Sequence, residues 1–325
     1  MKRNAAYELF AESSGMGKLP LVIICSPTAT GKTELVIELA SELGGEIISA
    51  DSLQVYRYLD IGTAKPSKEQ RNKVKHHMID VVNPDEEFNA AIYTGQARAI
   101  IDNLISQGKP VFVVGGTGLY IRALLRGIID TPAVDDKIRN HYRELLDLYG
   151  KEHLFNLLQQ RDEQAALKIN PNDSVRVIRA LEVLEQSGKS IIEIQEKHSF
   201  ADCPYTTYKI GIQSDRKELK NRIARRTEKM VAEGLLDEVK SLLDRGYSEN
   251  LKPLQSLGYK QVIEFLGGKY DWERALHLIA RNTWHYAKRQ MTWFAADKEI
   301  NWYNPDNLDD IKINVETFWK GNSLF

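Results

Sequence analysis

Short apolar runs alternate with longer amphipathic stretches along most of this 325-residue chain. Short apolar runs bounded by turn residues indicate buried strands, whereas apolar positions that recur every three or four residues indicate helices. We expect strands at residues 19–25, 46–51, 110–114, 208–212 and 299–303. Because helical stretches separate these strands, the pattern predicts an α/β fold in which a parallel sheet is covered by helices on both faces.

The middle of the chain has a different pattern, since residues 130–199 contain no convincing strand. We therefore expect a helical insertion domain at 130–199, inside a catalytic core formed by 19–129 and 200–325. A mixed, polar tail over residues 1–18 is expected to be disordered. The expected helices lie at residues 34–43, 119–126, 136–149, 152–161, 175–186, 216–246, 258–267 and 271–296.

Composition narrows the class of protein. Hydrophobic residues make up 42% and charged residues 27% of the chain, which is typical of a globular protein. No apolar run approaches the roughly 20 residues that span a bilayer. The two cysteines provide neither a disulfide framework nor a zinc spacing, so we expect a reducing cytoplasm. A net charge of −1 argues against a uniformly basic surface but allows a local basic patch.

The segment between the first strand and the first helix has the layout of a phosphate-binding loop. In such a P-loop, backbone amides and a helix N-terminus face the anion, Lys32 adds a charge and the Thr33 hydroxyl can ligate magnesium. The pattern usually starts with glycine, whereas this chain has Ser26. The alternative is a turn that only caps a helix. The residues expected to bind a diphosphate are Thr28, Ala29, Thr30, Gly31, Lys32 and Thr33.

Two further strand ends carry candidate chemistry, and ligands of open parallel sheets bind at this edge. Asp51 ends the second strand and is a candidate base or metal ligand, although it could instead cap a turn. Gly116 and Gly118 flank Thr117, where they could admit a ligand or serve a tight turn. The strand at 110–114 lacks the acid that an NTPase usually carries, which favours a reaction with pyrophosphate as leaving group.

A late helix carries a basic stripe. Side chains three or four residues apart share one helix face, and Trp284 and Arg289 flank them. Cations near aromatic rings suit RNA, although a solvated helix face is the alternative. The stripe consists of Arg274, His277, Arg281, His285 and Lys288.

Another helix begins with arginines after the fourth strand. One of Arg222, Arg225 and Arg226 could reach an anion in the crevice. The alternative is that they pair with carboxylates of the same helix.

Taken in order, these motifs resemble the bacterial tRNA dimethylallyltransferases, also called tRNA isopentenyltransferases. The similarity extends from about residue 20 to residue 303, and the ordered set is far more specific than any single motif. The matching segments are Pro27-Thr28-Ala29 with Gly31-Lys32-Thr33, Ala50-Asp51-Ser52, Gln54-Val55-Tyr56, 60–66, 115–120, Asn172-Asp173, Arg176, 179–182, 234–239, Gly258-Tyr259, 286–290 and 292–294.

The resemblance implies transfer of a dimethylallyl group from dimethylallyl diphosphate to N6 of the adenosine at tRNA position 37. Lys32 and Thr33 would hold the diphosphate and Mg²⁺, with Arg226 as a second diphosphate ligand. Asp51 would accept the amine proton, and Thr117 would contact substrate. The resemblance implies tRNA contacts at Asp51, Ser52, Leu53, Gln54, Thr117, Arg139, Val175, Arg176, Val177, Ile178 and Arg179. The stripe adds Arg281, His285 and Lys288, and the flanking Arg289 is expected to contact tRNA as well.

Other functions remain open at this point. A transferase for free adenine nucleotide would not need the insertion or the basic helix. A small-molecule kinase would need ATP turnover, and a silent RNA-binding protein would form no product. Relative to the family, Leu53 and Trp284 stand where arginine is common, and Ala295-Ala296 replaces one or two arginines. We expect a monomer that binds the anticodon stem-loop and no membrane.

Overall fold

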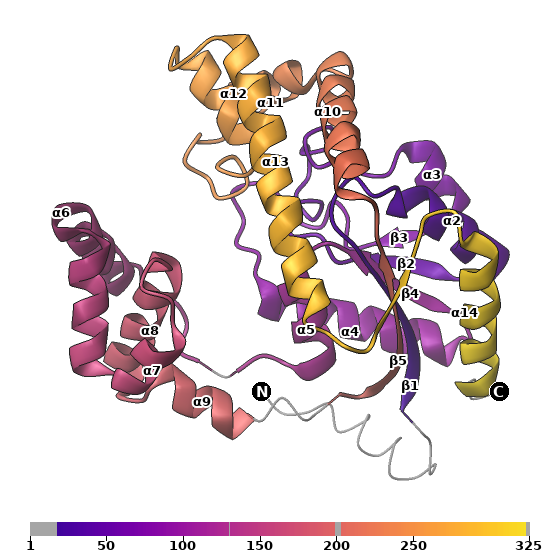
Figure 1. Cartoon of the computed structure of the whole chain (residues 1–325), viewed down its shortest axis with the longest axis horizontal. Coiled ribbons are helices and arrows are strands. Elements are labelled where there is room, and N and C mark those ends of the chain that lie inside the picture. The colour runs from indigo at the N-terminus through magenta and orange to yellow at the C-terminus, as the bar shows by residue number, and fades with distance from the viewer. Residues whose placement is uncertain (1–17, 130, 199–202, 323–325) are drawn as a thin grey trace. The chain divides into compact units, whose positions relative to one another are not determined.

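The computed structural model describes residues 18–129, 131–198 and 203–322. The chain forms two compact units, which are Met1–Leu125 with Pro204–Phe325, and Arg126–Cys203 (Figure 1). The expected tail at 1–18 lies outside the described residues except for Lys18. Within the described ranges, every helix is too short or too polar to span a bilayer.

The first unit is built on a six-stranded sheet in the order β3-β2-β4-β1-β5-β6, with every pair parallel. The predicted α/β fold is confirmed, and all five expected strands are present. A sixth strand, β3, has only two residues, both histidines, so it leaves no hydrophobic pattern. The strands are β1 (Leu19–Cys25), β2 (Glu46–Ser49), β3 (His76–His77), β4 (Val111–Gly115), β5 (Tyr205–Ile212) and β6 (Ile300–Tyr303).

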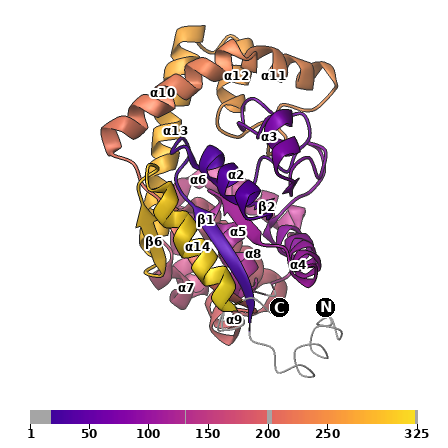
Figure 2. The same cartoon turned by 90° about the vertical axis from the view of Figure 1, so that its right-hand side faces the viewer.

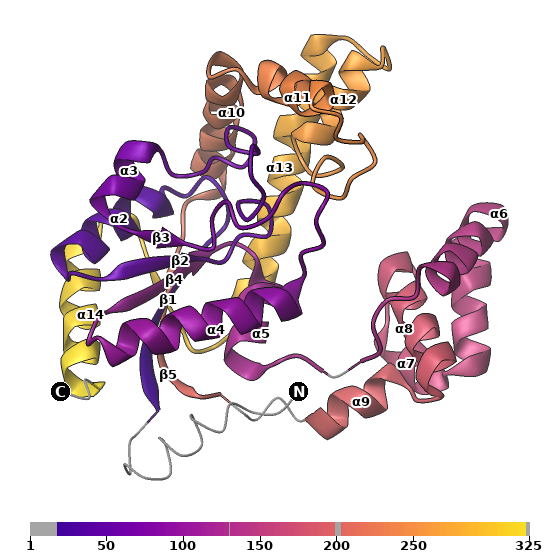
Figure 3. The ribbon, with the colours of Figure 1, turned by 180° about the vertical axis from the view of Figure 1, so that it is seen from behind.

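Helices cover both faces of the sheet. Helices α2 (Lys32–Glu42) and α14 (Leu308–Asn322) pack on one face, where Val36 and Ile311 join a core with Phe112 of β4. Figure 2 shows α14 in front of β1. The strands lie between these two helices and the pair α4 (Ala90–Ser106) and α5 (Gly118–Arg126), as Figure 3 shows from behind.

Four helices gather beyond the carboxyl ends of the strands (Figure 1). The single helix expected at 216–246 is divided by Gly234, whose φ of 100° belongs to the left-handed region. The last helix of the group buries Ile279, Ala287 and Phe294 and leaves its opposite face exposed. The helices are α10 (Arg216–Ala232), α11 (Leu235–Asp244), α12 (Tyr259–Leu266) and α13 (Trp272–Ala295), and a short α3 (Lys68–Lys73) precedes β3.

The second unit is helical and has its own core, to which Leu154, Leu158 and Leu181 contribute. Its first helix is interrupted at Gly150 (φ 80°, ψ 178°), which explains the two separate helical patterns in the sequence. The helices of this unit are α6 (Asp136–Arg161), α7 (Glu163–Lys168), α8 (Ser174–Ser187) and α9 (Ile191–His198).

Candidate active site at the carboxyl edge of the sheet

The loops that follow β1, β2 and β4 meet at one edge of the sheet. Strand β4 lies between β1 and β2, so its carboxyl end adjoins both neighbouring loops. The amide of Thr117 donates to the carbonyl of Ala50 at 3.1 Å, and the Thr117 hydroxyl accepts from the amide of Ser52 at 3.1 Å. Three candidate segments that are far apart in the sequence therefore share one site.

The loop after β1 tolerates a leading serine because its unusual backbone angles lie elsewhere. Ala29 and Gly31 adopt φ values of 64° and 86°, whereas Ser26 is not among the positive-φ residues. The buried Ser26 hydroxyl lies 2.7 Å from that of Thr30. The Ser26 hydroxyl thus stabilises the loop through Thr30. The residues that need left-handed backbone angles are 29 and 31, so position 26 does not require glycine.

Gln290 joins two of the loops from the buried face of α13. Its Oε1 accepts from the amide of Thr28 at 2.9 Å, and its Nε2 donates to the carbonyl of Gly116 at 2.8 Å. Gln290 is not among the expected site residues, because its side chain carries no charge. The available signal is its helix position, three residues after Ala287 and four before Phe294, both of which are buried. The Thr28 amide is consequently engaged by protein.

Three charged groups approach one another without pairing. Burial lowers the pKa of Lys32 to about 8, an effect that the nearby Asp51 carboxylate opposes and Arg226 adds to. Burial also lowers the pKa of Arg226, again against the charge of Asp51. None of the ion pairs within 4 Å in the described part of the chain joins any two of these groups. Two cations partly removed from water are a suitable receptor for an anion.

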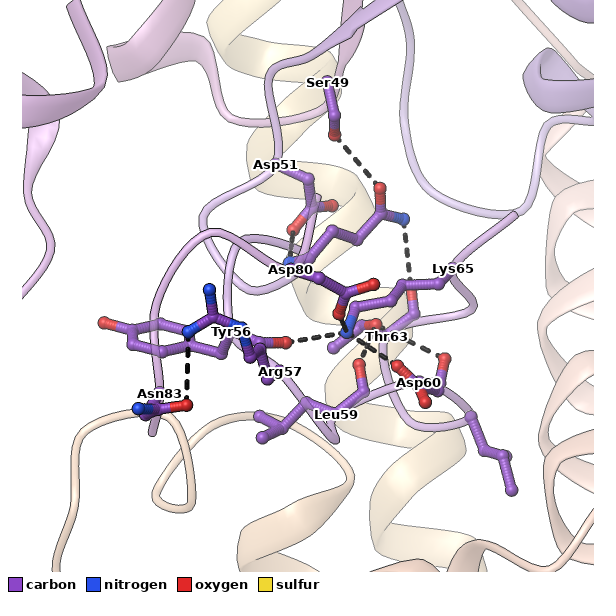
Figure 4. Close-up of polar contacts among 12 residues, drawn as sticks. Ser49, Asp51, Tyr56, Arg57, Leu59, Asp60, Thr63, Lys65, Asp80 and Asn83 are labelled. Carbon is purple, nitrogen blue, oxygen red and sulfur yellow. Dashed lines mark hydrogen bonds and ion pairs between the residues drawn. The ribbon is translucent and has the colours of Figure 1, made fainter. Parts of the chain in front are cut away.

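Asp51 closes a turn with one oxygen of its carboxylate. Its Oδ1 accepts the amides of Leu53 at 2.8 Å and Gln54 at 3.3 Å, which closes a turn after β2. Figure 4 draws one of the hydrogen bonds of Asp51. No described residue donates a hydrogen bond to Oδ2. One oxygen therefore shapes the loop while the other is available to a ligand.

The glycines beside Thr117 are required by packing. A Cβ on Gly116 would lie 2.2 Å from Gln290 Nε2, and one on Gly118 would lie 2.1 Å from Trp293 Nε1. These neighbours are protein side chains, so the glycines admit Gln290 and Trp293. The Trp293 ring also lies 5.0 Å below the guanidinium of Arg122. Neither glycine has a positive φ, so packing against these two side chains accounts for them better than a tight turn does.

The described residues contain no group of three or more His, Cys, Asp or Glu side chains that could hold a metal ion. The exposed Thr33 stands in the first turn of α2. A single hydroxyl fits Mg²⁺ only where substrate phosphates and water complete the shell, which is the usual arrangement for this ion.

The three arginines of α10 have different environments. Arg222 donates to the carbonyl of Thr30 at 3.0 Å and to Glu218 at 3.0 Å, so the ion-pair alternative holds for it. Arg225 is exposed, and Arg226 is the arginine whose charge acts on Lys32. Arg226 is thus better placed than its neighbours to meet an anion beside Lys32.

The basic stripe of α13 faces solvent. Its members are exposed, and none pairs with a carboxylate within 4 Å in the described part of the chain. The Arg289 guanidinium lies 5.8 Å from the Tyr286 ring centre. Trp284, by contrast, packs against the core cluster of Leu219, Ile223 and Ala287, and its ring centre lies 5.2 Å from the Lys220 ammonium. The exposed cations are Arg274, His277, Arg281, His285, Lys288 and Arg289.

Several residues expected to bind tRNA have structural partners in the second unit. Glu182 is fully buried, and both of its oxygens meet Arg139, at 2.5 and 2.9 Å, while Arg179 lies 3.1 Å from Oε2. Removing either arginine would leave a buried charge undercompensated. Val177 and Ile178 are 1% and 7% exposed, so their side chains are core residues rather than RNA contacts. Val175 and Arg176 are exposed.

Binding of inorganic pyrophosphate is expected to weaken as the pH rises through about 8, because Lys32 then loses the proton that makes it a cation. Above that pH the affinity should fall by up to about tenfold per pH unit. Isothermal titration calorimetry over this range measures it. Lys32→Arg is the control, because its guanidinium stays charged over this range and only the ligand titrates. An identical decline of pyrophosphate affinity in both proteins would contradict the prediction.

Known proteins resemble this chain over most of its length. Residues 54–297 match the family model described as IPP transferase. A tRNA dimethylallyltransferase 2 of Syntrophus aciditrophicus (strain SB) is 52% identical over 301 residues, covering 93% of this chain and 97% of the relative. The tRNA dimethylallyltransferase of Thermotoga maritima is 46% identical over 286 residues, covering 88% and 92%.

Solved structures share the fold. A tRNA isopentenylpyrophosphate transferase from Bacillus halodurans superposes with a TM-score of 0.70 at 36% identity, covering 94% of this chain and 98% of that one. A eukaryotic dimethylallyltransferase, described as acting on tRNA, superposes with a TM-score of 0.74 at 26% identity, covering 92% and 77%.

Proposed function

The chain belongs to the IPP transferase family, and on that premise we propose that it transfers a dimethylallyl group to an adenosine of tRNA. The donor is dimethylallyl diphosphate, and the acceptor is N6 of the adenosine at position 37, beside the anticodon. The observation that carries this proposal is the convergence of Lys32, Arg226 and Asp51 at one edge of the sheet. Cations for a leaving diphosphate and a carboxylate for a proton are what this reaction needs.

The chemistry follows from these residues. The bond between the allylic carbon and the diphosphate oxygen breaks, and its electron pair leaves with the diphosphate. Lys32 and Arg226 stabilise the charge that develops there. The N6 lone pair forms the new carbon–nitrogen bond, and N6 transfers its proton to Oδ2 of Asp51. Thr33 would hold Mg²⁺ with the diphosphate oxygens, and the ion would supply further positive charge.

The target base has to leave its stack to present N6 to the site. The exposed cations of α13 then bind the RNA backbone from the same helix that fastens the diphosphate loop through Gln290. Because the substrate is tRNA, we propose that the enzyme acts in the cytoplasm. We also propose that it does so as a monomer.

The function is tested by incubating the protein with dimethylallyl diphosphate, Mg²⁺ and an anticodon stem-loop, followed by mass analysis of the nucleosides. Dimethylallyl adenosine in the RNA supports the proposal. A parallel reaction with AMP tests the free-nucleotide alternative, and one with ATP tests a kinase. Absence of modified RNA alongside prenylated AMP would overturn the tRNA assignment.

Neutralising three cations of α13 is expected to reduce the salt dependence of tRNA binding. In Arg281→Gln/Lys288→Gln/Arg289→Gln, the slope of log K against log salt should become shallower by about 2–3, roughly one for each lost phosphate contact. Filter binding from low to high salt measures the slope. The control is Lys320→Gln on α14, where the lysine pairs with Glu316 at 3.4 Å. An unchanged slope in the triple variant would show that these cations lie on a solvated helix face and do not contact RNA.

A further inference from the structure

Resting on the proposed function, we infer that Glu238 of α11 is a positioning residue for Asp51. It acts through the loop at residues 60–64 and through Gln54, and it touches neither the diphosphate loop nor Asp51 among the described residues. The structure thus connects the helices beyond the sheet to the carboxylate that receives the proton.

Glu238 receives four hydrogen bonds. Its Oε2 accepts the amides of Asp60 at 2.9 Å and Ile61 at 2.7 Å, and its Oε1 accepts the amide of Gly62 at 3.0 Å. The Tyr259 hydroxyl of α12 donates to Oε1 at 2.6 Å. Three successive amides converging on one carboxylate fix both the position and the orientation of the loop, because bonds to an ionised acceptor are the stronger kind.

Residues of α12 and at the end of α11 also pack against the segment at residues 58–62. A Cβ on Gly62 would lie 2.5 Å from the Tyr259 ring, so the loop backbone rests directly on that ring. Tyr58 has a φ of 68°, and the Arg245 guanidinium lies 4.5 Å from its ring centre. Tyr58 is not glycine, so this conformation costs roughly 1 kcal/mol or more and persists only where contacts enforce it.

Gln54 transmits the loop position to Asp51. Its Nε2 donates to the carbonyls of Thr63 at 3.3 Å and Ala64 at 3.4 Å, and its Oε1 accepts from the Ser49 hydroxyl at 3.0 Å (Figure 4). Its own amide donates to Asp51 Oδ1. A shift of the carbonyls at 63 and 64 therefore moves the residue that closes the turn at Asp51.

A second anchor keeps the loop folded without Glu238. The Lys65 side chain is 2% exposed and lies 2.6 Å from both Asp60 Oδ1 and Asp80 Oδ1. It also donates to the carbonyl of Tyr56 at 2.7 Å (Figure 4). Loss of the Glu238 contacts is therefore expected to displace the segment at 60–64 without unfolding it.

Glu238→Gln tests the inference. In either orientation of the new amide, Nε2 would face at least one backbone amide donor where a carboxylate oxygen now accepts, and the side chain keeps its shape. Single-turnover transfer to an anticodon stem-loop is expected to slow by about 10- to 100-fold, because small displacements of reacting groups cost that much. The dissociation constant of inorganic pyrophosphate should stay within about twofold, since a tenfold change would need about 1.4 kcal/mol at the diphosphate loop. Asp237→Asn, the exposed neighbour, is the matched control.

A double-mutant cycle separates positioning from general destabilisation. Adding Glu238→Gln to Asp51→Asn should cost no further rate if Glu238 acts through Asp51. Equal multiplicative losses in both backgrounds, or loss confined to KM, would overturn the inference. If Glu238→Gln fails to fold, Tyr259→Phe removes one of the four bonds and enters the same cycle. A wild-type protein that forms no product would instead reject the proposed function.

Discussion

Asp51→Asn is expected to lower the rate of single-turnover transfer by about 10²- to 10⁴-fold, the usual contribution of a general base. The amide oxygen of asparagine can still accept the backbone amides of Leu53 and Gln54, so the turn after β2 survives. What disappears is the basic oxygen at Oδ2. Rapid-quench kinetics with a labelled stem-loop measure the chemical step.

The same variant distinguishes the two roles of this carboxylate. Asp51 opposes the fall in the pKa of Lys32, so its neutralisation should lower that pKa further and shift the pH dependence of pyrophosphate binding downward. Thermal unfolding should change little. If Asp51→Asn transfers the group at the wild-type rate while Asp51→Ala does not, Asp51 serves only to close the turn.

Gln290→Leu is expected to lower the free energy of unfolding by about 2–4 kcal/mol, because two polar groups lose their partner and leucine supplies none. These groups are the amide of Thr28 and the carbonyl of Gly116. The diphosphate loop should also lose its fixed position, so pyrophosphate binding should weaken by at least about tenfold. Urea denaturation and calorimetry measure the two effects.

Gln290→Glu is expected to keep one of the two hydrogen bonds and to lose the other. The carboxylate can still accept the Thr28 amide, but its second oxygen faces the Gly116 carbonyl, where Nε2 now donates. We expect it to lose stability while retaining more pyrophosphate affinity than the leucine variant. Thr292→Val, two positions along α13 and exposed, is the control. Equal stability of the control and Gln290→Leu would show that the bridge contributes nothing.

The sheet could be predicted because burial on both faces leaves nearly continuous apolar runs. Strand β1 has the expected bounds, and β5 begins three residues before the expected start. Strand β3 pairs through His76 and His77 alone, so its presence depends on β2 beside it and on no local pattern. The expected elements omit α14, which buries few residues, Ile311 and Val315 among them, but they also omit α4, which buries six, so sparse burial does not explain both.

The site was only partly readable for a similar reason. Charged residues in the loops after strands can be recognised in the sequence, and the charges of Asp51 and Lys32 do act on each other at the carboxyl edge of the sheet. Gln290 and Glu238 act on backbone groups of loops 174 and about 177 residues away in sequence, and no local pattern records such partners. The sequence likewise does not show that Arg139 of α6 and Arg179 of α8 both pair with the buried Glu182 of α8, and their expected tRNA contacts stay predictions.

The pairing of β1 with β5 has a consequence for synthesis of the protein. Leu19 meets Tyr205 across that pair, and the whole second unit is encoded between them. At translation rates of about 5–20 residues per second, β1 waits roughly 10 to 40 s for this neighbour. During that interval its outer edge offers unpaired backbone groups to other nascent chains. Slowly translated codons between Leu19 and Tyr205 would lengthen this interval, and we expect the nascent chain then to depend more on chaperones.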